Sequence, residues 1–129
     1  MKKKIKLYDS TLRDGAQTRG VNFSLDDKIK IISIRDEIGI DYIEGGWPGA
    51  NPTDDKFFKS IPKLKNSKAV AFGMMRKAGR KSKSDPGLNS VLNSGVSSVC
   101  LVGKTWDFHV KNALKISLNE NLDMISDSI

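Results

Sequence analysis

Short apolar segments with strand character alternate along this chain with segments that carry helix start and stop signals. Such alternation predicts parallel βαβ units. The expected strands cover residues 5–8, 40–44, 69–72 and 97–102. Four strand–helix units amount to half of a (β/α)8 barrel, which takes roughly 250 residues. We therefore expect the 129 residues to be the N-terminal half of a TIM barrel, a partial domain truncated at its C-terminal end.

Capping residues locate the helices between these strands. Ser24 with Asp27 at the third helical position predicts a capping box, and Gly39 is a typical stop. The three-to-four-residue spacing of Ile31, Ile34 and Ile38 predicts the apolar face of this helix. Further helices are expected from Asn51 or Thr53 to before Pro62, from the Asp85–Pro86 cap to Gly95, over 106–114, and over 119–129 after a capping box formed by Ser117 and Glu120.

Composition limits the possible partners. The net charge of +7 invites a nucleic-acid interpretation, and much of the excess lies in the loop 76–83. That loop has no aromatic residue to stack on a base. We interpret it as a solvated loop, with a phosphate-attracting flap over an active site as the alternative, and expect no nucleic-acid partner. No apolar run is long enough to span a membrane, so we expect a cytoplasmic protein without a membrane partner.

The single cysteine, Cys100, excludes an intrachain disulfide and a thiolate metal cluster. It lies in the apolar run 99–102, and nothing nearby in the sequence would lower its pKa. We therefore predict a buried structural thiol.

Polar side chains follow each expected strand. Arg13 and Asp14 follow the first, Glu44 ends the second, Arg76 follows the third, and His109 comes after the fourth. In a (β/α)8 barrel the catalytic groups occupy these C-terminal strand ends. An arginine can neutralise an oxyanion through its planar fork, and an aspartate can ligate a hard divalent cation. The pattern favours chemistry on an oxyanion.

Three motifs resemble one enzyme family. DSTLRDGAQ at 9–17 is similar to the signature of the metal-dependent acyl-CoA condensing and cleaving barrels. That family includes isopropylmalate, homocitrate and citramalate synthases and hydroxymethylglutaryl-CoA lyase. YIEGGWPGANP at 42–52 and GKTWDFHV at 103–110 resemble the citramalate synthase branch. The resemblance runs from residue 4 to residue 129.

The resemblance implies roles for individual residues. Asp14 matches the metal-ligating aspartate, and Arg13 matches the arginine that stabilises the enolate and alkoxide oxygens. Glu44 matches the glutamate that holds this arginine and is a candidate for the proton relay; a plain ion pair is the alternative. Gln17 and His109 are substrate-binding candidates, each with a structural role as the alternative.

The reaction implied by the resemblance condenses acetyl-CoA with pyruvate to give (R)-citramalate and CoA, a step of isoleucine biosynthesis. It would use Mg²⁺ or Mn²⁺, whose remaining family ligands, a His-x-His pair on a later strand, do not occur in this sequence. We therefore expect residues 1–129 alone to be inactive, and the full-length parent to be a homodimer. The alternatives are 2-isopropylmalate synthase, of leucine biosynthesis, and a non-catalytic basic fragment that binds RNA or protein.

Overall fold

The computed structural model describes residues 5–129, which form one parallel sheet with its helices. Within these residues the strands follow the order β1-β2-β3-β4, and every neighbouring pair is parallel. Their bounds are β1 Tyr8–Asp9, β2 Tyr42–Gly46, β3 Lys68–Met74 and β4 Ser98–Val102. The α/β class and the four predicted strand positions are confirmed, although each strand begins one to three residues later than expected, except β3, which begins one residue earlier.

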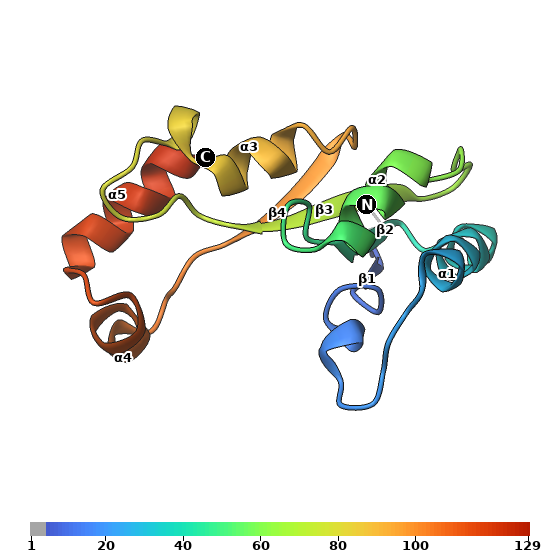
Figure 1. The fold of residues 1–129 in the computed structure, drawn as a ribbon, viewed down its shortest axis with the longest axis horizontal. Helices are drawn as coiled ribbons and strands as arrows, with labels where there is room; N and C mark the ends of the chain where they lie inside the picture. Colours follow the sequence, from blue (N-terminus) through green and yellow to red (C-terminus); the bar gives the residue numbers. More distant parts are fainter. Residues whose placement is uncertain (1–4) are drawn as a thin grey trace.

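Helices connect consecutive strands, as parallel pairing requires. The connecting helices are α1 Leu25–Ile38, α2 Pro52–Ser60 and α3 Pro86–Leu92, and α4 Asp107–His109 and α5 Leu118–Ser128 follow β4. Figure 1 shows α2 and α3 along one side of the strands, with the β1–α1 connection and α4 at opposite ends of the sheet. No helix within residues 5–129 has the length and apolar character needed to cross a membrane.

The start and stop signals of α1 act as predicted. The Ser24 hydroxyl accepts a hydrogen bond from the Asp27 backbone N–H at 3.1 Å, and the Asp27 carboxylate accepts one from the Ser24 backbone N–H at 3.0 Å. Gly39 ends the helix in the left-handed conformation, with φ of 87°. Only half of the second predicted capping box, at the start of α5, is formed. Ser117 caps Glu120 at 3.1 Å, but the Glu120 carboxylate accepts instead from Arg76.

The predicted apolar face of α1 is wrong at two of its three positions, since only Ile31 packs, partly buried, against the core. Ile34 and Ile38 are 53% and 64% exposed, whereas Lys28, Ile32 and Asp36 are buried. The two charged residues can be buried because each has polar partners inside the protein. The Asp36 carboxylate accepts three backbone N–H groups from the loop between α2 and β3, at 2.8 to 3.1 Å.

The core fills the space between the sheet and the helices. Ile43 and Ala71 from adjacent strands pack with Leu12, Ile32 and Phe57, all fully buried. Phe57 reaches the sheet because Gly45 has no side chain; a Cβ there would lie 2.4 Å from the Phe57 ring. This packing fixes α2 directly under the end of β2.

The segment after β4 departs from the prediction of one helix over 106–114. It consists of the short α4 followed by a π-helical turn at Val110–Leu114, which ends at Lys115 with φ of 56°. Cys100 on β4 is half-buried rather than buried. The third helix ends at Leu92, with Asn93 as its C-cap, before the predicted stop at Gly95.

Candidate active site

The loop after β1 presents the candidate arginine. The Asp9 carboxylate accepts hydrogen bonds from the backbone and hydroxyl of Thr11, both at 3.1 Å. The Ser10 carbonyl then accepts the N–H groups of Arg13, Asp14 and Gly15 at 2.8 to 3.2 Å. Leu12 at the centre of this turn is fully buried in the core. Leu12 therefore anchors the turn, and the next two side chains project from it.

Arg13 is held by a buried carboxylate on the next strand. Its Nε donates to Glu44 Oε2 at 2.9 Å, and its Nη1 donates to Asp14 Oδ1 at 3.0 Å. Its guanidinium carbon lies 4.1 Å from the centre of the Phe72 ring on β3. An ion pair on one side and an aromatic face on the other fix the direction of the guanidinium.

Glu44 and Asp14 differ in their exposure to solvent. The Glu44 side chain is 1% exposed, and that of Asp14 is 63% exposed. Glu44 Oε1 is buried without a hydrogen-bond partner among the described residues. The structure thus brings together three of the predicted residues, Arg13, Asp14 and Glu44, at the C-terminal ends of β1 and β2.

Tyr8 on β1 is only partly buried, with 48% of it exposed, and it neighbours Cys100 and Glu44. Burial is the main cause that raises the pKa of its phenol, and the neighbouring Cys100 and Glu44 act in the same direction. Tyr8, Glu44 and Cys100 come from three different strands, so the parallel sheet brings these side chains near one another.

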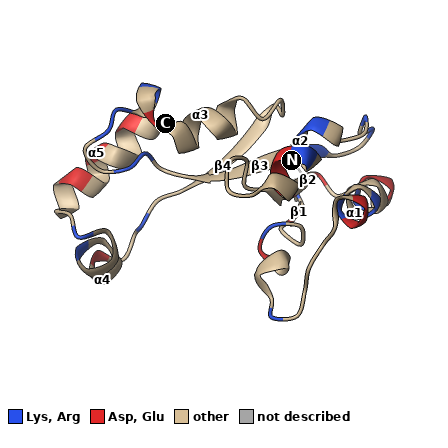
Figure 2. Ribbon diagram, in the orientation of Figure 1, with Lys and Arg blue, Asp and Glu red and all other residues tan. Residues whose placement is uncertain are grey.

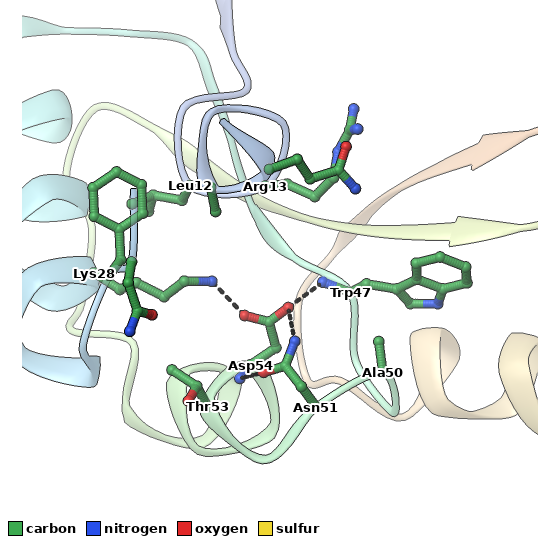
Figure 3. Close-up of a pocket in the computed structure, with 12 residues that line it drawn as sticks. Leu12, Arg13, Lys28, Trp47, Ala50, Asn51, Thr53 and Asp54 are labelled. Atoms are coloured by element: carbon green, nitrogen blue, oxygen red, sulfur yellow. Dashed lines mark hydrogen bonds and ion pairs between the residues drawn. The ribbon is translucent and has the colours of Figure 1, made fainter. Parts of the chain in front are cut away.

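Gln17 and His109 occupy different surroundings. Gln17, in the 3-10 turn Gly15–Gln17, lines a cleft of about 390 Å³ together with Arg13 and Trp47. Figure 3 shows this cleft between the β1 turn and the start of α2. His109 lies on α4, at the other end of the sheet in Figure 1, where its ring contacts Trp106 and Phe108 at centroid distances of 4.6 and 6.3 Å. Its substrate role stays a prediction.

Arg76, the polar residue after β3, serves the fold. Its side chain is 9% exposed, and its guanidinium pairs with Glu120 at 3.2 Å and with Asp127 at 2.8 Å, both on α5. Figure 2 shows the remaining Lys and Arg residues distributed over several helices and loops rather than gathered on one element.

Sequence reasoning missed Lys28, Asp54 and Trp47, which line the same cleft. Only Lys28 offered a signal in the sequence, because it lies four residues before the apolar residue Ile32 on the same helix. A hydropathy pattern nevertheless assigns a lysine to solvent.

Asp14 offers a metal ion one exposed carboxylate. Residues 5–129 contain no group of three or more His, Cys, Asp or Glu residues that could hold a metal ion.

Fold and site together define a parallel β/α scaffold with an arginine held by carboxylates at the strand ends. The chain belongs to the HMGL-like family, whose model matches residues 4–129. It is 52% identical over 98% of its length to the (R)-citramalate synthase of Sulfolobus acidocaldarius, and 48% identical over its whole length to that of Aquifex aeolicus. The 2-isopropylmalate synthase of Sulfurisphaera tokodaii is more distant, at 32% identity over 98% of the chain.

The chain spans about a quarter of the length of the two citramalate synthases, and 31% of the 2-isopropylmalate synthase. Among solved structures, the hydroxymethylglutaryl-CoA lyase of Pseudomonas aeruginosa matches 95% of this chain with a TM-score of 0.71 and 21% identity. The match covers 40% of the lyase chain. The fold is therefore that of part of a TIM barrel, as predicted.

Proposed function

We propose that this chain contributes Arg13, Asp14 and Glu44 to the active site of an enzyme that condenses acetyl-CoA with pyruvate. The products are (R)-citramalate and CoA, and one water is consumed when the thioester is hydrolysed. One observation carries the proposal: Arg13 is held by the buried Glu44 and lies beside the exposed Asp14 at the ends of two parallel strands. The 52% identity to a citramalate synthase supports pyruvate as the oxo acid.

Arg13 is proposed to bind the negative oxygen that develops during the condensation. Its Nε is engaged by Glu44 and its Nη1 by Asp14, which leaves Nη2 without a side-chain partner in these ion pairs. A well-placed donor to a developing oxyanion contributes about 3 kcal/mol to transition-state stabilisation. Because Glu44 and Phe72 already fix the guanidinium, little reorganisation accompanies this contact.

Asp14 is proposed to be one ligand of Mg²⁺ or Mn²⁺. Its carboxylate supplies a hard oxygen donor, the type these ions prefer, and its 63% exposure leaves it accessible. Such an ion would polarise the carbonyl of the oxo acid as a Lewis acid. We propose that the other ligands come from outside residues 5–129.

Glu44 is the proposed member of a proton relay within this chain. One of its oxygens is engaged by Arg13, while Oε1 is buried and has no partner among the described residues. An unpartnered acceptor in such a dry position can receive a proton at Oε1. Gln17, at the edge of the adjoining cleft, is proposed to contact substrate, and His109 stays a weaker candidate.

The test is a chimera in which this chain replaces the matching quarter of the S. acidocaldarius enzyme. CoA release is measured with pyruvate, 2-oxoisovalerate and 2-oxoglutarate, with the 129-residue chain alone as the control that we expect to be inactive. We expect a preference for pyruvate. A preference for 2-oxoisovalerate would instead support the alternative, a 2-isopropylmalate synthase. One enzyme of that kind is 32% identical to this chain.

A second class of function, a non-catalytic basic module, predicts tight and salt-sensitive RNA binding by the chain. We expect weak binding, because the basic residues are distributed over several helices and loops and the basic loop 76–83 has no aromatic residue to stack on a base. The homodimer, the cytoplasmic location and the assignment of residues 1–129 as a partial catalytic domain stay predictions.

A further inference from the structure

A second buried ion pair lies beneath the candidate site. Lys28 on α1 and Asp54 on α2 are 3% and 7% exposed, and Lys28 Nζ donates to Asp54 Oδ1. The other Asp54 oxygen accepts from the Asn51 side chain at 3.1 Å and from the Trp47 backbone N–H at 2.9 Å. Figure 3 shows Asp54 at the centre of these contacts, with Lys28 approaching from the opposite side.

This pair holds the residues that directly follow Glu44. Lys28 Nζ donates to the Gly45 carbonyl at 2.8 Å, and Asp54 binds the N–H of Trp47. Gly46 between them has φ of 147°, and a Cβ on it would lie 2.6 Å from the Asp54 carboxylate. The segment 45–47 therefore packs closely against the ion pair, and both of its ends are hydrogen-bonded to the pair.

Two series of contacts connect the Lys28–Asp54 pair to Arg13. Glu44 is the neighbour of Gly45 and holds Arg13 Nε at 2.9 Å. Trp47 packs edge-on against Phe72, with ring centroids 5.3 Å apart, and Phe72 lies 4.1 Å from the Arg13 guanidinium carbon. The Lys28–Asp54 pair is thus linked to each of the two groups that fix Arg13.

We propose that Lys28 and Asp54 are a positioning pair for Arg13: they hold the Gly45–Trp47 segment so that Glu44 and Phe72 confine the guanidinium. The pair does not touch Arg13 and acts through these residues. Its consequence for catalysis rests on the proposed function, whereas its consequence for the Arg13 side chain does not. The two consequences are therefore measured separately.

The first test is NMR of the 15N-labelled 129-residue chain. The Arg13 Nε–H signal is assigned by its loss in Arg13→Lys, and its exchange with water is measured. In Lys28→Met and Asp54→Asn we expect a shifted signal and exchange that is faster by about tenfold or more. Met124→Ala is the control: it makes a cavity under α5, outside the core cluster that contains Leu12, and should leave the signal in place.

An unchanged Arg13 signal and exchange rate in folded Lys28→Met and Asp54→Asn would overturn the proposal. The pair would then only stabilise the fold. If neither variant folds, Trp47→Leu is used instead, since it removes the half-buried ring that packs against Phe72. We expect the same shifted Arg13 signal and faster exchange in this variant. An equal change in Met124→Ala would also contradict it, because a general loss of rigidity would then explain the effect.

The second test is kinetic and uses the chimera. Misplacement of a transition-state group by about 1 Å costs on the order of 100-fold in rate, so kcat should fall by about 10- to 100-fold in Lys28→Met. KM for pyruvate should change by less than about threefold, because the lost contact belongs to the transition state. Lys111→Met, which breaks the exposed pair with Asp107, should leave both constants unchanged.

The two tests fail in different ways. An altered Arg13 signal with an inactive parent chimera would contradict the proposed function and support the positioning pair. A normal kcat in Lys28→Met with an active parent would overturn the catalytic consequence alone.

Discussion

Replacing Glu44 with glutamine removes the charge that holds Arg13 and should destabilise the chain. Truncating one partner of a fully buried ion pair costs about 3–5 kcal/mol, because the other charge stays buried and unpaired. Two features of this pair reduce that cost. Arg13 is 22% exposed and retains Asp14 at 3.0 Å, and Glu44 already has one buried oxygen without a partner. We therefore expect a loss of about 2 kcal/mol for Glu44→Gln.

Urea unfolding followed by circular dichroism measures this loss. With a slope of about 2 kcal/mol per molar urea for a chain of this size, the midpoint should fall by about 1 M. Asp107→Asn is the matched control, since its ion pair with Lys111 is 2.9 Å long but more than half exposed on both sides. It should leave the midpoint unchanged.

A double-mutant cycle with Arg13→Met completes the test. If the pair is the source of the loss, Arg13→Met combined with Glu44→Met should cost less than the sum of the two single variants. A midpoint that falls by less than about 0.25 M in Glu44→Gln would refute the reasoning, because the Arg13–Glu44 contact would then contribute almost nothing.

Two further predictions concern the scaffold. Gly45→Ala should cost about 3 kcal/mol or prevent folding, since the new Cβ would lie 2.4 Å from the Phe57 ring; a urea midpoint within about 0.3 M of the parent would contradict this. Asp36→Asn should reduce the acid sensitivity of the fold. The backbone N–H of Lys65 is the main cause that holds the pKa of Asp36 below its usual value, so the native state binds fewer protons than the unfolded state. The stabilisation is complete above the unfolded pKa, about 4, and is lost as pH falls through the lower native pKa. Denaturation midpoints between pH 6 and pH 2 should decline less steeply in Asp36→Asn, and an identical decline would contradict the assignment.

The sequence allowed most of the fold to be predicted, because the signals involved are local. Ser24 with Asp27 and Gly39 bound a helix through hydrogen bonds made within a few residues, so the pattern alone sufficed. The buried face of α1 could not be predicted in this way. Lys28 and Asp36 are buried only because distant segments supply their partners, and a hydropathy pattern contains no information about those partners.

The same distinction applies to the candidate site. Arg13 and Asp14 follow the first expected strand and Glu44 lies at the end of the second, and parallel pairing of β1 with β2 brings the three together. Arg76 also follows a strand, yet its partners on α5 make it a structural residue. A strand-end position alone therefore did not separate the two kinds of arginine. Glu120 illustrates the same limit, since its carboxylate pairs with Arg76 instead of completing a capping box.

The central claim is that this chain supplies the oxyanion-binding arginine and one metal ligand of a pyruvate-condensing site. The most direct measurement is CoA release from acetyl-CoA and pyruvate by the chimera, as a function of Mn²⁺ concentration, for the parent and for Asp14→Asn. Asp14 is 63% exposed and outside the core, so the variant should fold like the parent. The account predicts a metal-dependent rate in the parent and, in Asp14→Asn, a loss of about 100-fold or more with a higher Mn²⁺ requirement. A variant with the parent's rate and the parent's Mn²⁺ dependence would contradict it.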